Sequence, residues 1–537
     1  MQRPLLIGAL VAIALTGIGG GIWLLTRSHE PQVEPAPADE AAAPRHGRRG
    51  SRHGEASDPM RDVNDDSPVT PPDALIAIIR PHDPKLAKPD AAPVQAPTTL
   101  PNVVVMLGCT VRKDQLSPYG ADSFITPRLY ALAKSGTLFD DVIAAAPWTR
   151  AASTAILTGQ HALNIGMVEP SSGRDDSRIP DGTKTLAEYM RARGYLTVGA
   201  TSNPNLSAVF GFDRGFDAYQ PGLPDKWGAK LSGRTLADAV LTELKAKRAA
   251  GDTRPVYLRT MMLDAHAPRS ASGDALMPFR EEGVPERVAQ YRYHLHKLDD
   301  AIGYTMDQLA TIGIDPSNTV FVFVGDHGEG MNYPGHHGFG HGQYFGSSSV
   351  YVPWIMSGVG VARNHRVLGL ASQVDVLPTL LGVIGAPLSP TDPTDGQDWS
   401  ALVRGNPGAI DRDHVISDTW FAASSRAAIF TPYLQCQQDF GSSARQQRKG
   451  KFVPGCYDRY EDVLFAHPLP DTDPRHAELD ALTATLVGWR KAGTDALGTL
   501  QHQNAPVSED LAQQLGALGY VDAEEAGGDK AAKRAKP

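Results

Sequence analysis

Short apolar runs alternate with longer amphipathic segments over most of this chain, and that alternation constrains the fold more than any other feature. Residues 103–107 are all apolar and rich in β-branched side chains, as expected for a parallel strand buried on both faces. Similar runs span 195–200, 256–263, 319–324 and 352–356, and helical patterns span 185–193, 235–248 and 287–312. Strands that alternate with helices predict an α/β fold with a mostly parallel central sheet flanked by helices.

The N-terminal segment indicates where the chain resides. Residues 5–25 form an almost unbroken apolar run, long enough to cross a hydrocarbon core of ~30 Å as a helix. A cleaved signal peptide is the alternative, but the run is long for an h-region and lacks a convincing cleavage site. We therefore expect 1–27 to be a transmembrane anchor, or otherwise a signal sequence. The rest of the chain would lie outside the cytoplasm, in the periplasm or at the cell surface.

Two further segments are unlike a folded domain. Residues 28–98 are rich in Pro, Ala, Asp and Arg and have no hydrophobic period, and 522–537 form a charged, Ala-rich tail. Such segments bury too little apolar surface to offset their ordering entropy, so both are predicted to be disordered. The net charge of -9 argues against a nucleic-acid partner. Cys436 and Cys456 could pair in an oxidising compartment or could both stay reduced.

Chemically rich residues follow the predicted strands, where parallel sheets collect their functional groups. Asp326 and His327 follow 319–324 in a glycine-rich turn that suits a metal, although a plain polar turn is the alternative. A second glycine-rich loop ends at His341, and a stretch after the 256–263 strand carries His266. Either histidine could contact an anionic ester or protonate a leaving group, or could be an ordinary loop residue.

The region around Thr149 offers a nucleophile. Thr149 stands where the N-cap of a small-residue helix, 151–159, is expected. The same place would suit a nucleophilic hydroxyl, because free amides at a helix start stabilise an oxyanion. Arg150 follows it, and Arg112 lies in the loop after the first strand. Both guanidinium groups could bind an anionic substrate, or Arg112 could face solvent.

In their order along the chain, these segments resemble the sulfatase family of the alkaline-phosphatase superfamily. The resemblance covers about residues 100–525 and rests on seven stretches, which are 101–120, 126–129, 147–159, 211–217, 263–266, 325–329 and 374–379, with a further similarity at 515–520. It implies a sulfatase-like catalytic domain over 99–405 and a smaller C-terminal α+β subdomain over 406–521.

Two positions depart from the family pattern. Cys109 stands where the family has a metal-binding Asp, and Thr149 stands where it has the Cys or Ser that becomes formylglycine. Calcium and magnesium prefer oxygen ligands, whereas zinc would accept Cys109 together with Asp326 and His327. A buried cysteine that binds no metal is the alternative. The family's Gly-Lys-Trp-His segment is also missing, and Asn203-Pro204 occupies the comparable stretch.

The resemblance therefore implies a metal-dependent hydrolase or transferase for sulfate or phosphate esters that works without formylglycine. In it Thr149 would be the nucleophile, and His266 and His341 would contact the substrate or leaving group. The remaining predicted site residues are the substrate-binding Arg112 and Arg150 and the metal ligands Asp326, His327 and Cys109. The cofactor would be a divalent metal (calcium, magnesium, manganese or zinc), and the anionic ester could belong to an envelope lipid or glycan. The alternative is an inactive sulfatase-like pseudoenzyme with a binding or envelope-associated role.

Overall fold

The structure is a computed structural model of the chain, and its described part begins at Asp73. The described residues are 73–86, 93–168, 175–220, 231–282, 284–333, 336, 338–421, 424–442, 452–497, 500 and 503–518. The apolar run within 1–27 and the tail 522–537 lie outside them. Among the helices that the structure does describe, none is long and apolar enough to cross a membrane.

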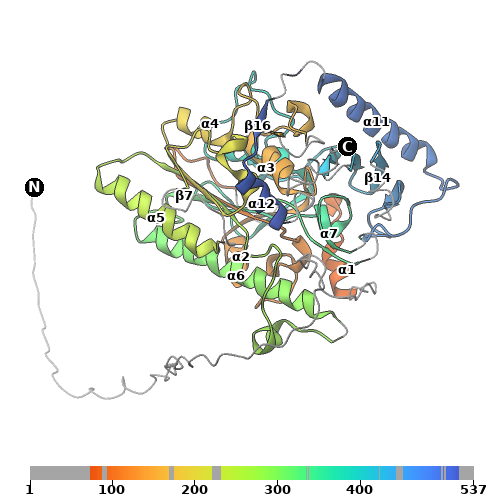
Figure 1. Ribbon diagram of the computed structural model, residues 1–537, viewed down its shortest axis with the longest axis horizontal. Helices are drawn as coiled ribbons and strands as arrows, with labels where there is room; N and C mark the ends of the chain where they lie inside the picture. Colours follow the sequence, from red (N-terminus) through yellow and green to blue (C-terminus); the bar gives the residue numbers. More distant parts are fainter. Residues whose placement is uncertain are drawn as a thin grey trace, which may run out of the picture. The chain divides into compact units, whose positions relative to one another are not determined.

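A large sheet lies at the centre of the described chain, with helices around it (Figure 1). It has eight strands in the order β11-β2-β10-β7-β1-β6-β4-β5. Its strands are β1 (Asn102–Gly108), β2 (Gly136–Ile143), β4 (Leu196–Thr201), β5 (Ala218–Tyr219), β6 (Val256–Met262), β7 (Thr319–Gly325), β10 (Trp354–Gly358) and β11 (His365–Ser372). The neighbours from β5 to β7 are all parallel, whereas β10 is antiparallel to both β7 and β2. The predicted mostly parallel sheet is confirmed.

Helices flank this sheet, as the alternating pattern predicts. The main ones are α2 (Pro127–Lys134), α3 (Thr149–Thr158), α4 (Leu186–Ala192), α5 (Gly233–Ala249), α6 (Glu286–Ala310) and α8 (Val376–Val383). α4 begins with a capping box, because Thr185 accepts a hydrogen bond from the backbone of Glu188 and the Glu188 side chain accepts one from Thr185. The long helices α5 and α6 pack against each other.

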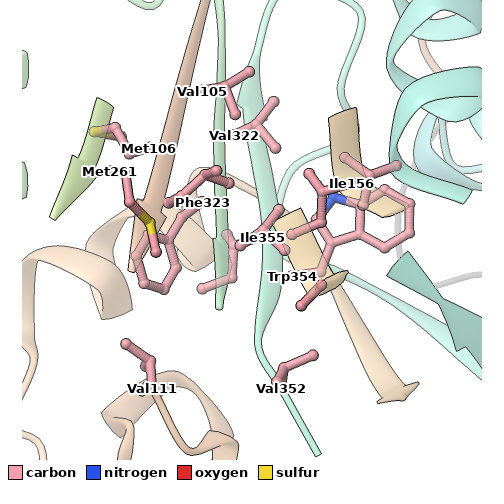
Figure 2. Packing of buried hydrophobic residues seen from close by; sticks show 14 of the residues in the cluster. Val105, Met106, Val111, Ile156, Met261, Val322, Phe323, Val352, Trp354 and Ile355 are labelled. Atoms are coloured by element: carbon pink, nitrogen blue, oxygen red, sulfur yellow. The ribbon is translucent and has the colours of Figure 1, made fainter. Parts of the chain in front are cut away.

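The core lies at the sheet, and Figure 2 shows its central side chains. Val105 and Met106 of β1 and Phe323 of β7 are fully buried, because both strands lie inside the sheet. Trp354 of β10 stacks on Phe139 of β2 at 3.7 Å between ring centroids. Fully buried strands carry apolar side chains on both faces, which explains why these runs do not alternate with polar residues.

A smaller subdomain follows the large sheet. Helix α11 (His476–Leu497) packs against its four-stranded antiparallel sheet. The strands of this sheet are β12 (Val415–Thr419), β13 (Arg426–Phe430), β14 (Leu434–Asp439) and β15 (Gly455–Asp458). A disulfide joins Cys436 of β14 to Cys456 of β15, so these cysteines are paired. The predicted α+β subdomain is confirmed, while its boundaries at 406 and 521 stay a prediction.

One part of the predicted linker 28–98 is ordered in the structure. Helix α1 (Asp73–Ile79) lies within it, and Ile79 is buried in the main core. His82 then bonds the Asp140 carboxylate through both its backbone N–H and its ring Nδ1, each at 2.8 Å. The prediction of disorder is therefore wrong for 73–86, because a short apolar run there finds a partner surface that the sequence does not reveal.

Candidate active site

The candidate site lies where four neighbouring strands end and helix α3 begins. Cys109 directly follows β1, Asp326 follows β7, and His266 lies in the loop after β6. Because β4, β6, β1 and β7 are adjacent and parallel, these residues meet at one edge of the sheet. Thr149 is the first residue of α3, and Trp148 holds the N-cap position without a side-chain cap. The N-cap is therefore one residue earlier than expected, at Trp148 instead of Thr149. The Thr149 hydroxyl turns toward the strand ends.

Three possible metal ligands lie together and are fully buried. One ligand atom each from Cys109, Asp326 and His327 lies within 4.8 Å of the others. Asp326 Oδ1 accepts hydrogen bonds from the backbone N–H groups of Thr110, at 3.0 Å, and His327, at 2.6 Å. No described backbone group donates to Oδ2, which lies 3.4 Å from His327 Nε2. Burial raises the pKa of Asp326 to about 6, since a charged carboxylate loses hydration there.

The Thr149 hydroxyl is held among the same groups. Its Oγ1 lies 3.1 Å from His327 Nε2 and 3.5 Å from Cys109 Sγ, and Asn203 Nδ2 donates to it at 3.4 Å. His327 Nδ1 lies 2.8 Å from the Gly328 carbonyl, so Nδ1 carries the proton and Nε2 presents its lone pair to the site. Burial and the neighbouring His341 hold the pKa of His327 well below its usual value, so this imidazole is neutral.

A layer of ionisable groups lies beside these donors. The His341 ring lies 4.4 Å from that of His327 and 5.3 Å from that of His266, centroid to centroid. Glu329 Oε1 lies 3.4 Å from His341 Nδ1, and Glu329 Oε2 accepts from Arg269 at 2.8 Å. Burial alone would raise the pKa of Glu329, but His341 and Arg269 hold it well below its usual range. Glu329 therefore stays charged and orients His341.

The two predicted arginines lie in different settings. Arg150 stacks on Phe210 at 3.8 Å from the ring centroid, and its Nη2 donates to Asn205 Oδ1 at 3.0 Å. Arg112 is fully buried, and two of its nitrogens donate to Asp114 at 2.9 and 2.6 Å. Arg112 thus has a structural partner, and its contact with substrate stays a prediction. Arg150 directly follows Thr149 and remains the better candidate for binding an anion.

Some members of this cluster were not predicted. Asn203 Nδ2 lies 3.5 Å from Cys109 Sγ as well as near Thr149, so this residue connects the thiol and the hydroxyl. Glu329 and Arg269 form the buried ion pair beside the histidines. Glu329 could have been predicted as a site residue, because it lies only two residues after His327 in the sequence. Nothing in the sequence around Arg269 indicates that it belongs to the site. His336 of the glycine-rich loop is held by a serine, with Nδ1 2.8 Å from Ser349 Oγ.

Comparison with known proteins finds sulfatases and related enzymes among the proteins that this chain resembles. A family model described as Sulfatase matches residues 101–386. The chain is 26% identical to an ulvan-active sulfatase of Formosa agariphila over 357 residues, which cover 59% of this chain and 68% of that protein. It is 24% identical to the low-salt glycan biosynthesis sulfotransferase Agl7 of Haloferax volcanii over 426 residues, or 75% of this chain and 95% of the relative.

Solved structures share the architecture. A putative sulfatase from Bacteroides thetaiotaomicron superposes with a TM-score of 0.59 at 16% identity, covering 75% of this chain and 95% of the other. The phosphonate monoester hydrolase of Agrobacterium radiobacter superposes with a TM-score of 0.56 at 18% identity, covering 73% of this chain and 96% of the other. At these identities the similarity shows the fold alone.

Proposed function

The chain belongs to the sulfatase family, and we propose that it is a metal-dependent enzyme that transfers or hydrolyses sulfate or phosphate esters with Thr149 as its nucleophile. The observation that carries this proposal is the position of the Thr149 hydroxyl, 3.1 Å from His327 Nε2 and at the start of helix α3. A hydroxyl in that place is close to a group that can orient it, and it belongs to the first turn of a helix, where free amides can stabilise an oxyanion.

Formylglycine chemistry does not apply to this residue. Formylglycine is an aldehyde made from the primary Cβ of Cys or Ser, whereas the Cβ of threonine also carries a methyl group. The intact hydroxyl must therefore act directly. Its oxygen would form a bond to sulfur or phosphorus as the ester bond to the leaving alcohol breaks, and a water or an acceptor hydroxyl would then release the group from Thr149. A bound divalent cation would favour loss of the hydroxyl proton and neutralise the anionic ester.

The other residues of the cluster suit the remaining roles. His266 and His341 lie together next to His327, and either imidazole could give a proton to the leaving alkoxide. Arg150 supplies positive charge next to Thr149. The similar proteins named above, a sulfatase, a glycan biosynthesis sulfotransferase and a phosphonate monoester hydrolase, all act on anionic groups of this kind. An anionic ester on an envelope glycan or lipid is therefore the proposed substrate class.

The proposed location is the membrane surface outside the cytoplasm. The disulfide between Cys436 and Cys456 supports an oxidising compartment, where such bonds form and persist. The apolar run 5–25 supports an anchor that keeps the enzyme near envelope substrates.

A pseudoenzyme is the second candidate, and Cys109 is the observation that favours it. A thiol in place of an expected carboxylate would remove a hard-metal site, and Cys109, Thr149 and Asp326 are all fully buried. The fold would then serve binding alone.

Substitution of Thr149 separates these functions. We would assay aryl sulfate, phosphate monoester, phosphodiester and phosphonate monoester substrates with the metal-loaded full chain. Thr149→Ala should lower kcat by at least about 1000-fold, whereas Thr149→Ser should keep part of the activity because it keeps the hydroxyl. Ser153→Ala is the matched control, since Ser153 is buried one turn further along α3, and it should change kcat by no more than about threefold.

Two results would contradict the proposal. Activity that survives in Thr149→Ala would exclude Thr149 as nucleophile. Metal-loaded wild type that turns over none of the four substrates would favour the pseudoenzyme.

A further inference from the structure

We propose that Cys109, Asp326 and His327 form a zinc site and that the Cys109 thiolate selects zinc over calcium, magnesium and manganese. This inference rests on the proposed function in that it assigns the metal of the same site. The spacing of the donors, their chemical type and the groups that orient them all support a zinc site.

The spacing of the donors leaves room for a small tetrahedral ion, because the three ligand atoms all lie within 4.8 Å of one another. With zinc bonds of about 2.0–2.1 Å to nitrogen and oxygen and about 2.3 Å to sulfur, tetrahedral donors lie about 3.3–3.4 Å apart, or about 3.5–3.6 Å when one is sulfur. His327 Nε2 lies 3.4 Å from Asp326 Oδ2 and 3.1 Å from Thr149 Oγ1. Cys109 Sγ lies 3.5 Å from Thr149 Oγ1. Three protein donors beside the Thr149 hydroxyl would leave a fourth position for substrate, as catalytic zinc sites do and structural ones do not.

The chemical type of the donors disfavours calcium. Calcium takes six to eight oxygen ligands at about 2.3–2.6 Å, and magnesium takes six in near-octahedral geometry. Here the donors are one sulfur, one nitrogen and one carboxylate. The other acids of the surrounding loops are already engaged: Asp264 accepts from the Gly233 backbone at 2.9 Å, and Glu329 is paired with Arg269. Thiolate, imidazole and carboxylate together are a typical zinc set.

The surroundings hold each ligand in place. His327 Nδ1 donates to the Gly328 carbonyl, and Asp326 Oδ1 accepts two backbone hydrogen bonds, which leaves Nε2 and Oδ2 to face the site. Asn203 Nδ2 lies 3.5 Å from Cys109 Sγ, where its amide can donate to a thiolate. Partners of this kind orient metal ligands and tune their basicity.

The test uses the single thiol of the chain. Of the three cysteines in the sequence two form the disulfide, so any metal–thiolate signal comes from Cys109. The full chain, purified in mild detergent and stripped of metal, would be offered zinc, calcium, magnesium and manganese at equal concentration. Bound metal is measured by mass spectrometry. In parallel, cobalt(II) replaces zinc, and a near-ultraviolet charge-transfer band reports its bond to sulfur.

We expect one zinc per chain and a cobalt–thiolate band in wild type. Cys109→Ser should lose the band and bind zinc at least about 100-fold more weakly. Loss of a residue that only hydrogen-bonds a metal ligand lowers metal affinity by ~10–100-fold, so a larger decrease indicates a direct ligand. Cys109→Asp should shift binding toward calcium, magnesium or manganese. His476→Gln is the control, because His476 is an exposed histidine at the start of α11 and belongs to no part of the cluster, and it should leave both readouts unchanged.

Preferential uptake of calcium, magnesium or manganese by wild type, or cobalt binding without the band, would overturn the zinc assignment. Both results are measured on wild type, so they decide the question even if Cys109→Ser fails to fold. The proposed function fails separately: zinc-bound protein without turnover would refute catalysis and leave the site intact. Turnover with calcium and no cobalt–thiolate band would refute the zinc site alone.

Discussion

A buried ion pair connects the C-terminal subdomain to the strand that leads toward Thr149, and its removal should cost several kcal/mol. Arg459 follows β15, and its Nη2 donates to both carboxylate oxygens of Asp141 on β2, at 2.7 and 3.0 Å. Its Nε donates to the Tyr351 hydroxyl at 2.7 Å. The two charged side chains are 0% and 4% exposed, so solvent does not screen the pair.

Arg459→Met tests this pair. Methionine fills much of the volume of the arginine stem, so the change removes charge and hydrogen bonds while leaving only a small cavity. Loss of one partner of a buried pair costs about 3–5 kcal/mol, because the other charge stays buried without compensation. Lys113 also interacts with Asp141 and would relieve part of this cost, so we expect a decrease of about 3 kcal/mol in the free energy of unfolding.

The assay is urea unfolding of the full chain at pH 7, followed by circular dichroism. Replacing both residues, Arg459→Met with Asp141→Leu, should restore at least about half of the loss, since no charge is then left unpaired. Arg475→Met is the control: Arg475 lies in the same subdomain and pairs with Asp458 at 2.7 Å, but it is 35% exposed, and its loss should cost below about 1 kcal/mol. A decrease of less than about 1 kcal/mol in the free energy of unfolding for Arg459→Met would refute a stabilising role of the buried pair. An equal decrease for Arg459→Met and Arg475→Met would refute it as well.

Three further predictions concern pH, the disulfide and the substrate. Burial raises the pKa of Asp299 to about 6, so between pH 4 and 6 the native state keeps a proton that the unfolded chain has lost. The free energy of unfolding should therefore fall by up to about 3 kcal/mol as the pH rises from 4 to 6. Asp299→Asn should remove this fall from the pH profile of the free energy measured by urea unfolding. Replacing Cys436 and Cys456 together by Ser opens a loop of 20 residues and should cost about 3 kcal/mol in the same assay, whereas an unchanged midpoint would contradict the entropic reasoning. Arg150→Lys keeps the charge but loses the stacking on Phe210, so KM for an anionic ester should rise about tenfold with a smaller change in kcat; an unchanged KM would argue against substrate contact.

Much of the large domain could be predicted because its signals are local. The run 103–107 lies within β1, and the helical patterns at 185–193 and 287–312 correspond to α4 and α6 within a few residues. The direction of β10 was not predictable, since an apolar run of five residues carries no information on its neighbours. Helix α1 was missed for a related reason: its stability depends on contacts with the domain, which a composition argument cannot supply.

The candidate site divides in the same way. Asp326, His327, His266 and Thr149 could be singled out because their residue types suit chemistry at the ends of predicted elements. The part played by Asn203, Glu329 and Arg269 emerged only from the structure, because each acts through a partner on another segment. Arg112 shows the reverse case, in which a residue suited to anion binding is engaged by Asp114 inside the protein.

By itself, the sequence determined the alternation of strands and helices in the large domain, which chemical groups stand at the ends of the predicted elements, and that Thr149 cannot become formylglycine. These properties depend on side-chain period and on residue type, which are local. The tertiary structure alone decided that Cys109 lies 3.5 Å from a hydroxyl 40 residues away and that this hydroxyl lies 3.1 Å from an imidazole 178 residues further on. Such distances are set by strand order, register and packing of the whole core, so only the tertiary structure shows that Cys109, Asp326 and His327 lie together.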